Sequence, residues 1–528
     1  MNDELKYLAG RAAQGRVSRR AFMGRAAALG VGAGMASNML ASAVSAQGAV
    51  KGGMLRAGLV GGESTNTLDP ALAASEVPAE VNYGWGEPLV EVSPEGNIIP
   101  RLASDFSGSA DVKSWSFKVR SGVTFSNGKS LTSDDIKATL ERHSDENSQS
   151  GALGIVKDIE SIEAKGDMVT VNLANGNADF PYMMADYHLL IQPNGGKDDP
   201  AAGIGTGPYT VEVNEPGVRH ALKKNPNYWD SDYGHVDEVE ILVINDATAR
   251  IAALQSGQVD MINRVDPKIV DLLRRDPNVS VKSVAGRGYY CFNLLCDTAP
   301  TDNYDLRMAL KFAVNRQEMV DKILNGLGSV GNDTPINAAY PLFDASIEQR
   351  EYDPDKAAFH FKKSGYDGPP IELYTAASAF SGAIEAAQLY QQSAAAAGIS
   401  LEVKRSPDDG YWDDVWRFKQ FSACYWSGRP VQDQMYSTAY SSDAPWNDTN
   451  WYNDQFTNLI IAARTEMNQD VRKQMYSDAA RIMMDDGGLI VPMFNNFVDG
   501  TGPRVAGWSD NPNGEMMSSR ALYSCWVA

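Results

Sequence analysis

The amino-acid sequence predicts an α/β fold that is divided into several domains. Short segments in which apolar and polar residues alternate recur along the chain, as at residues 115–120 and 168–173, and this period is typical of half-buried strands. Segments with helical start and stop signals follow them, and strands that alternate with helices indicate an α/β architecture. A chain of 528 residues is also longer than one hydrophobic core supports, so its length predicts about two to four domains.

The first half of the chain is expected to be rich in strands. An apolar segment at residues 54–60 opens the pattern, and the two alternating segments named above continue it. Between those two, Ser-Asn-Gly at residues 126–128 supplies a turn. Thr132 can then cap a helix over residues 136–142, because acidic residues occupy its first turn, where the helix dipole favours them.

The second half is expected to be more helical. Asp246 can cap a helix that stops at Gly257, between strands at 236–244 and 279–284. The other expected elements are a long helix from Leu306 to Gly326, a helix from Pro354 to Gly365, a helix over 381–397, a strand over 400–404, helices near 410–419, 454–466 and 470–485, and a buried strand over 489–494.

Residues 1–46 have the pattern of an export signal. Ser-Arg-Arg-Ala-Phe-Met at residues 18–23 resembles the twin-arginine motif, a weakly apolar stretch follows, and Val-Ser-Ala at 44–46 suits signal peptidase. The stretch contains Arg25 and is shorter than the roughly 20 apolar residues of a membrane span. We therefore expect cleavage near Ala46 and a free protein in the periplasm.

The charge of the chain excludes several classes of partner. The formal net charge is −20, and it becomes −24 when the six basic and two acidic residues of segment 1–46 are removed. Nucleic acid and anionic membranes would repel such a protein. The four cysteines, Cys291, Cys296, Cys424 and Cys525, leave either disulfides or buried free thiols open, and no Cys-x-x-Cys motif indicates a metal.

Several sequence blocks carry a more specific signal. The clearest is Gly-Val-Thr-Phe-Ser-Asn-Gly at 122–128, followed by Leu-Thr-Ser-Asp-Asp-Ile at 131–136. The others are Thr-Leu-Asp-Pro at 67–70, Glu-Pro-Leu-Val at 87–90, Gly-Thr-Gly-Pro-Tyr at 205–209, Asn-Pro-Asn-Tyr-Trp at 225–229, Leu-Gln-Ser-Gly-Gln-Val-Asp at 254–260, and Phe-Asn at 292–293 before Asp-Leu-Arg-Met-Ala-Leu at 305–310. Together these blocks resemble the bacterial extracellular solute-binding proteins of family 5, the dipeptide, oligopeptide and nickel-complex receptors of ABC importers.

This resemblance implies a bilobal periplasmic-binding-protein fold of type II, with mixed sheets, an inserted subdomain and a two-strand hinge. It assigns residues 47–90, 205–290 and 496–528 to lobe I, 91–204 to the inserted subdomain and 291–495 to lobe II, with hinge crossings near 289–293 and 494–498. The implied function is to bind a peptide or peptide-like solute between the lobes and to present it to an inner-membrane permease. We expect a monomer.

The resemblance also implies ligand-binding residues. An engulfing peptide receptor needs charges for the ligand termini and backbone groups for its amides. Trp426, Ser427 and Gly428 resemble the family's Gly-Trp-x-Gly-Asp stretch, in which an Asp pairs with the ligand ammonium. Asp433 is the nearest candidate, although a helix cap or a solvated loop carboxylate is an equal alternative. The remaining expected contacts are Arg429, Tyr289, Tyr290, Asn293, Trp446 and Trp85.

One departure from the dipeptide receptors leaves the solute open. Those proteins place a carboxylate-gripping Arg before the helix that corresponds to residues 381–397, and this sequence has Ala-Phe-Ser-Gly at 379–382. Arg429 could take that role, or the solute could be an opine-like amino compound, an oligosaccharide or a nickel complex. An exported hydrolase is the most distant alternative.

Motifs for catalysis and cofactors are not found in the sequence. Gly-Leu-Gly-Ser-Val-Gly at 326–331 follows a helix rather than a strand, which argues against a dinucleotide site. The five histidines, His143, His188, His220, His235 and His360, never pair at ligand spacing, and neither Gly-x-Ser-x-Gly nor His-Glu-x-x-His occurs. We therefore expect no enzyme activity, cofactor or metal.

Overall fold

The computed structural model describes residues 22, 24–26, 49–407, 410–444 and 446–528. The expected twin-arginine pair Arg19 and Arg20 and the expected cleavage point after Ala46 lie outside the described residues. Within the described part of the chain, no helix is long and apolar enough to cross a membrane.

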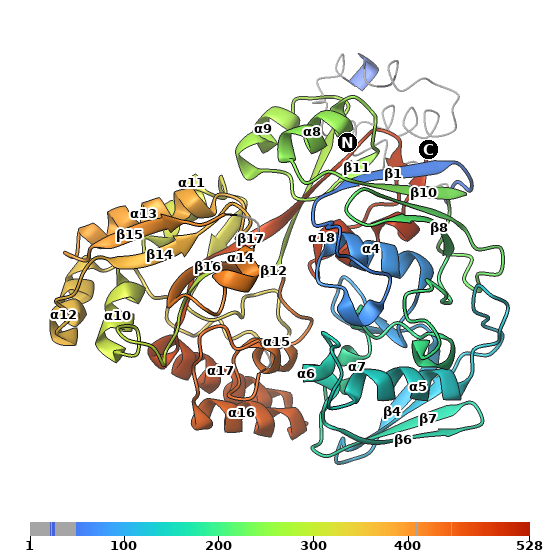
Figure 1. Ribbon diagram of the computed structural model, residues 1–528, viewed down its shortest axis with the longest axis horizontal. Helices are drawn as coiled ribbons and strands as arrows, with labels where there is room; N and C mark the ends of the chain where they lie inside the picture. The colour runs from blue at the N-terminus through green and yellow to red at the C-terminus, as the bar shows by residue number, and fades with distance from the viewer. Residues whose placement is uncertain (1–21, 23, 27–48, 408–409, 445) are drawn as a thin grey trace.

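One mixed sheet runs through the whole molecule (Figure 1). Its strand order is β15-β14-β16-β12-β17-β11-β1-β10-β9-β8, and β13 pairs with β17 beside this path. The strands are β1 (Met54–Leu59), β8 (Tyr209–Glu215), β9 (Arg219–Lys224), β10 (Glu238–Val243), β11 (Met261–Ile262), β12 (Ser280–Leu294), β13 (Gly328–Val330), β14 (Ile371–Thr375), β15 (Leu401–Arg405), β16 (Phe421–Trp426) and β17 (Leu489–Thr501).

Smaller sheets belong to the same side of the molecule as β1. The first sheet pairs β2 (Val90–Val92) with β3 (Ile98–Pro100). The second has four strands in the order β4 (Ala103–Gly108), β5 (Ser114–Val119), β7 (Met168–Leu173) and β6 (Ile159–Lys165). The third pairs β18 (Val505–Ala506) with β19 (Trp526–Val527). The four-stranded sheet and the helix packed on it bury a core of their own, which includes Phe117, Ile136 and Val169. This unit is the inserted subdomain at the lower right of Figure 1.

Helices cover both lobes. On the β1 side they are α4 (Glu76–Trp85), α5 (Ser133–Ser144), α6 (Leu153–Val156), α7 (Phe180–Met183), α8 (Ala247–Gln255), α9 (Val270–Leu273), α18 (Glu515–Ser519) and α19 (Ala521–Ser524). On the other side they are α10 (Tyr304–Phe312), α11 (Arg316–Lys322), α12 (Pro354–Ser364), α13 (Ala383–Ala395), α14 (Tyr411–Asp414), α15 (Gln432–Ala439), α16 (Asp454–Thr465) and α17 (Gln469–Asp486).

The two longest strands join the lobes. One half of β12 pairs with β17 next to β11, in the first lobe, and its other half pairs with β16 and β17 in the second. The register between β12 and β17 shifts between Ala285 and Tyr289, where Gly286 and Gly288 flank Arg287. The two expected hinge strands are therefore present. The irregular step lies at 286–288, next to the expected crossing at 289–293.

The long helix expected from Leu306 to Gly326 is wrong. The structure has two helices there, α10 and α11, because Asn315 adopts a non-helical conformation and caps α11 by accepting a hydrogen bond from the Glu318 amide. The apolar period continues through this break, since both helices face the same core. Periodicity alone therefore did not reveal the interruption.

Candidate functional site

The lobes meet beside the irregular step of β12, and small residues allow this close approach. A Cβ atom on Gly286 would lie 2.2 Å from the Phe497 ring, so a side chain cannot be accommodated there. Gly428, two residues beyond β16, has a φ of 80°, and a Cβ atom there would lie 2.4 Å from the Cβ of Arg287. The backbone of lobe II therefore reaches the hinge itself.

Arg287 is the cation at this point. Its side chain is only 3% exposed, and it donates to the Asn513 carboxamide and lies 5.2 Å from the centre of the Tyr340 ring. Its Nε has no hydrogen-bond partner, and no carboxylate among the described residues forms an ion pair with it. Burial lowers the pKa of this guanidinium. A buried cation without a counter-ion suits a site that receives an anion.

Four carboxyl groups gather on the lobe I side of the same interface. Glu76 and Glu80 are one turn apart on α4, Asp499 is on β17 and Glu515 begins α18. Arg264 pairs with Glu515 alone, donating from Nε to both of its oxygens at 2.7 and 2.9 Å. We call Glu76, Glu80, Asp499 and Glu515 the lobe I carboxyl cluster.

Burial and mutual repulsion disfavour the charged form of this cluster. Desolvation, followed by the nearby Glu515 charge, raises the pKa of Glu76 to about 8, and the same two causes raise that of Asp499 to about 8. Desolvation and the Glu76 charge raise the pKa of Glu80 well above its usual value. Near neutral pH the cluster therefore holds protons that an approaching cation could displace.

Lobe II places aromatic rings opposite the cluster. The Tyr425 ring lies 5.3 Å from the guanidinium carbon of Arg264, which is a contact between the lobes, and Tyr290 stacks on Phe380 at 4.3 Å. Arg264 and Tyr290 are both half-buried beside this contact.

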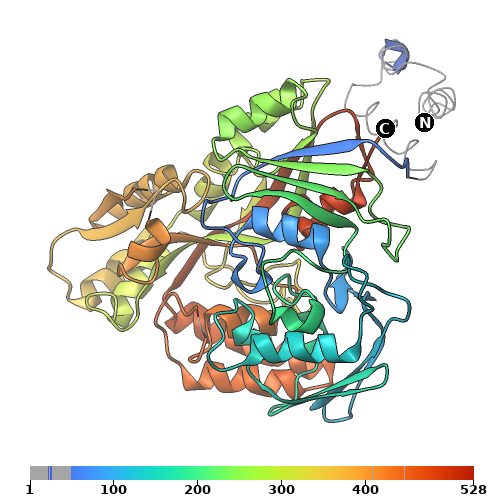
Figure 2. The same cartoon turned by 45° about the vertical axis from the view of Figure 1, so that its right-hand side comes forward.

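A second set of contacts closes the rim of the interface. Nη1 of Arg472, on α17, donates to Asp179 at 3.0 Å, and the Ala178 amide donates to the Arg464 carbonyl at 2.7 Å. Lys157 of the inserted subdomain pairs with Asp443 at 2.7 Å. Figure 2 shows α16 and α17 against this subdomain, as Figure 1 also does. The structure is therefore in a closed form.

In this closed form, Asp433 forms an ion pair with Arg464. It is completely buried on α15, where Nε of Arg464 donates to its Oδ1 at 2.7 Å and Ser437 donates to the same oxygen at 3.1 Å. Asn177 of the inserted subdomain approaches the other oxygen at 3.4 Å. Asp433 is therefore neither the cap of α15 nor a solvated loop carboxylate, and Arg464 already occupies the place that an ammonium anchor would offer to a ligand.

Three of the other expected contacts belong to a polar centre inside lobe II. The indole of Trp426 and the carboxamide of Asn293 donate to Oδ2 of Asp448, at 3.0 and 2.7 Å. Trp446 packs against Trp426, with ring centres 5.9 Å apart. Burial raises the pKa of Asp448 to about 6. These side chains therefore have partners inside lobe II.

Tyr289 and Trp85 are core residues. Both are fully buried, Tyr289 shares a 2.7 Å hydrogen bond with the Tyr440 hydroxyl, and the Trp85 indole donates to Asn82 at 3.1 Å. The resemblance places Tyr289 at the cleft, and Trp85 is an aromatic candidate of lobe I, whereas each packs in a core within one lobe.

The other expected contacts lie at or just beyond the end of β16, beside the hinge. Ser427 is exposed, and Gly428 touches Arg287 as described above. The backbone amide of Arg429 donates to the Tyr340 hydroxyl at 3.1 Å. Tyr290 lies opposite Tyr425 in the pairing of β12 with β16, so Tyr290, Ser427, Gly428 and Arg429 lie close to one another at the end of β16.

The sequence interpretation missed Arg287 and the carboxyl cluster. The pattern Gly-Arg-Gly at 286–288 could have suggested a close backbone approach beside a cation. Glu76 and Glu80 are spaced four residues apart and so lie on one face of a helix that is otherwise apolar there. No local signal places Asp499 or Glu515 next to that helix.

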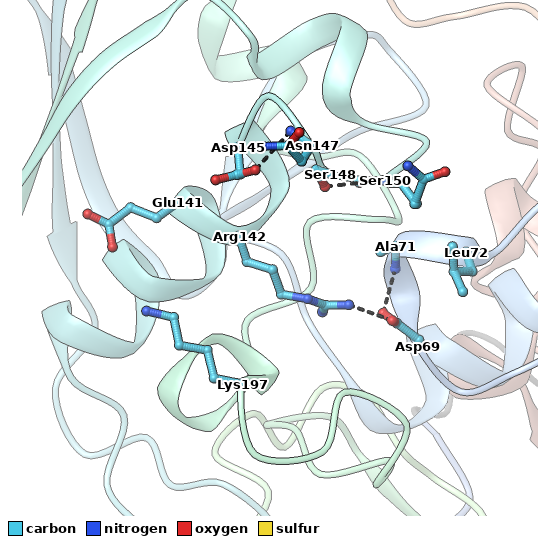
Figure 3. A pocket seen from close by; sticks show the side chains of 11 residues that line it. Asp69, Ala71, Leu72, Glu141, Arg142, Asp145, Asn147, Ser148, Ser150 and Lys197 are labelled. Carbon is cyan, nitrogen blue, oxygen red and sulfur yellow. Dashed lines mark hydrogen bonds and ion pairs between the residues drawn. The ribbon is translucent and has the colours of Figure 1, made fainter.

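A separate hollow of about 490 Å³ lies on the surface near α5 (Figure 3). Its lining includes Arg142, which donates to Asp69, and Lys197. All of its lining residues come from lobe I and the inserted subdomain. Closure of the lobes therefore does not shut it, and it is not the candidate site.

The four cysteines are free thiols in the structure, with Cys291, Cys424 and Cys525 buried. Among the described residues, no group of three or more His, Cys, Asp or Glu side chains has the geometry of a metal site.

Comparisons with known proteins agree with this architecture. The chain is 27% identical over 432 residues to di/tripeptide-binding protein 1 of Pseudomonas aeruginosa, covering 74% of this chain and 79% of the relative. It is 25% identical over 467 residues to the oligopeptide-binding protein OppA of Bacillus subtilis, covering 80% and 84%. The structure of the periplasmic binding protein DppA of Helicobacter pylori with the peptide STSA matches with a TM-score of 0.81 and 21% identity, over 92% and 99% of the two chains.

A match to a model of a whole protein family shows which family the chain belongs to. The model of the bacterial extracellular solute-binding proteins, family 5 Middle, matches residues 97–448, which is more than half of the chain. Members of this family are binding proteins rather than enzymes. The protein is therefore a member of the bacterial extracellular solute-binding proteins of family 5, the substrate-binding components of ABC importers.

Proposed function

We propose that the protein captures a peptide or peptide-like solute between its lobes and presents the closed complex to an inner-membrane permease. The observation that carries this proposal is the contact between the lobes, along which lie an unpaired guanidinium, the edge of a carboxyl cluster and an aromatic ring. Relatives named for di/tripeptides and oligopeptides support this class of solute.

The solute would hold the lobes together by touching both. A ligand shifts an open–closed equilibrium only through contacts that are better in the closed state. Arg287 would receive an anionic group of the solute, replacing the carboxylate-gripping Arg that is missing at 379–382. Tyr290, Ser427, Gly428 and Arg429 would add backbone and side-chain contacts. An affinity near micromolar, about −8 kcal/mol, requires only a few such contacts.

The moving parts follow the family division. We propose that residues 47–90, 205–290 and 496–528 move together with 91–204, and that residues 291–495 form the opposing lobe. The step at Gly286–Gly288 and the facing residues of β17 would absorb the rotation, since hinges are a few positions that take up a change in backbone angles.

Export by the twin-arginine route belongs to the same proposal. Residues 18–23 and 44–46 support a cleaved signal, and membership of an extracellular family supports a periplasmic location for the mature chain. We propose that it acts there as a monomer. Replacing Arg19 and Arg20 with Lys should retain the precursor in the cytoplasm, which cell fractionation would detect.

A thermal-shift screen followed by small-angle scattering tests the binding function. The screen compares dipeptides, tripeptides, longer peptides, opine-like compounds, oligosaccharides and nickel chelates, because a ligand that binds the folded state raises its apparent stability. We expect peptides or peptide-like compounds to give the largest shifts and to reduce the radius of gyration. Shifts confined to sugars or nickel chelates would contradict the peptide proposal while leaving solute binding intact.

A further inference from the structure

We propose that the lobe I carboxyl cluster receives a cationic group of the solute, an ammonium or a guanidinium, so that lobe I holds the positive end of the ligand. This inference deepens the proposed function and rests on it. The solute would then carry both a cation, for the cluster, and an anion, for Arg287.

The count of charges within the cluster is the first argument. Arg264 is the one cation that forms an ion pair with any of the four carboxyl groups among the described residues, and its partner is Glu515. Arg520 lies nearby but pairs with Glu91 at 2.9 Å. Glu76, Glu80 and Asp499 therefore have no counter-ion in the described part of the chain.

Unpartnered oxygen atoms are the second argument. Glu80 is 1% exposed and neither of its carboxyl oxygens has a hydrogen-bond partner, while Asp499 is 2% exposed and its Oδ1 has none. Native proteins pair most buried polar groups, and each exception needs an explanation. A cation delivered by a ligand would supply the missing charge partner.

The backbone around the cluster is the third argument. Met516, Met517, Ser518 and Ser519 all have φ between 48° and 61°, a left-handed turn formed without glycine. Such residues cost about 1–2 kcal/mol each in this conformation. The turn directs the Met516 amide to Asp499 at 2.8 Å and the Ser519 hydroxyl to Glu76 at 2.9 Å. Strain held by the surrounding fold is often found at functional sites.

The neighbouring aromatic ring shows that a cation is accepted at this place. The guanidinium of Arg264 already lies over the Tyr425 ring from lobe II. A second cation beside it would touch carboxyl groups of lobe I and aromatic rings of lobe II at once. Such a ligand therefore makes contacts that exist only when the lobes are closed.

Binding of a cation should release protons. The groups that act on Glu76 are Glu515, Asp499, Glu80 and the cation Arg264, with the Ser519 hydroxyl, and Tyr187 also lies close. A cationic ligand favours the charged carboxylates, so affinity should rise with pH between about 5 and 8, by up to tenfold per pH unit for each proton released.

Isothermal titration calorimetry with paired probes tests the inference. The pairs are Ala-Lys with Ala-norleucine, and Ala-Ala with acetyl-Ala-Ala, measured in two buffers of different ionisation enthalpy. The first pair differs in a side-chain ammonium and the second in the α-ammonium. We expect that, in one of the two pairs, the probe without the ammonium has a Kd at least tenfold higher. Only the cationic member of that pair should release protons on binding. If both pairs bind equally and no proton is released, the inference is overturned, while the binding function stands.

Variants give a readout that does not depend on finding the natural solute. Glu76→Gln and Asp499→Asn remove charges that the free protein cannot compensate, so both should raise the melting temperature of the ligand-free protein at pH 8 and abolish the preference for the cationic probe. Glu95→Gln, at an exposed position of the inserted subdomain, should change neither. If Glu76→Gln and Asp499→Asn both lower the ligand-free melting temperature at pH 8, the cluster is structural and the inference is wrong.

Discussion

At the residue scale, Arg287 sets the strongest constraint on what can bind. Removing a guanidinium from water costs several kcal/mol unless an anion and good hydrogen bonds replace the solvent. Arg287 has the Asn513 carboxamide and the Tyr340 ring, but its Nε has no partner. The incomplete compensation of Arg287 lies at the hinge, beside Gly428 of the opposing lobe.

Substitution of Arg287 by Met should separate binding from folding. Because no carboxylate would be left unpaired, we expect the melting temperature of the ligand-free protein to stay within a few degrees or to rise. The Kd for a peptide with a free carboxylate should increase at least tenfold, a loss of about 1.4 kcal/mol or more. Titration calorimetry with a free and an amidated peptide measures this.

The matched control is Arg274→Met, which removes an exposed guanidinium from the residue that follows α9 in the same lobe. It should leave both affinities unchanged. Equal binding of the free and the amidated peptide to the unsubstituted protein would show that Arg287 does not hold the carboxylate.

At the element scale, the pairing of β12 with β16 places two thiols side by side. Cys291 lies directly opposite Cys424 in the antiparallel register, and the Cys291 thiol donates to the Cys424 carbonyl at 3.4 Å. Burial raises the pKa of both thiols, which suppresses the reactive thiolate. The pair is therefore protected from oxidation by its environment, even in a compartment that permits disulfides.

A thiol titration checks this protection. We expect four reactive thiols after unfolding in denaturant without reductant, in agreement with the four cysteines of the chain, and very slow labelling of the native protein. Cys296 should react first, because it alone keeps partial exposure. A count of two in unfolded, unreduced protein would instead indicate a disulfide between Cys291 and Cys424.

Elements with local chemical signals were predictable. Thr132 does cap α5 and forms a capping box with Asp135, Asp246 caps α8, and α12 runs from the proline after Asp353 to a left-handed Gly365. These signals depend only on neighbouring residues. The break between α10 and α11 was missed because the apolar pattern passes through it without a proline or glycine.

The site was less predictable, because it is assembled from segments far apart in the sequence. Glu76 meets Asp499 and Glu515 only through the folding of the chain's last segment onto α4. Family resemblance directed attention to Trp426 and Asp433, where the motif is recognisable, but a partner such as Arg464 cannot be read from a motif. Trp85, Trp426 and Trp446 were also predicted to contact the ligand, but the size of a tryptophan places it in a core as readily as in a binding site.

At the scale of the whole molecule, closure depends on contacts far from the candidate site. Arg472 and Asp179 form a buried two-pronged ion pair between α17 and the inserted subdomain, and the Ala178 amide bonds to the Arg464 carbonyl beside it. We call Arg472 and Asp179 the rim pair. In an open form both would return to water, so the rim pair contributes to the closed state alone, and its effect on affinity is separate from any contact with the solute.

Replacing Arg472 with Leu should therefore weaken binding without touching the site. The closed form would keep a buried Asp179 without its cation, whereas the open form would not, and this shifts the equilibrium toward opening. We expect a larger radius of gyration in ligand-free scattering and at least a tenfold increase in Kd for any solute.

Lys157→Leu breaks the exposed Lys157–Asp443 pair across the same rim and should have a much smaller effect, because exposed pairs contribute about 0–1 kcal/mol. The double variant Arg472→Leu, Asp179→Leu removes both charges and should recover part of the lost affinity. Unchanged scattering and unchanged Kd in Arg472→Leu would mean that the solute contacts alone hold the lobes closed.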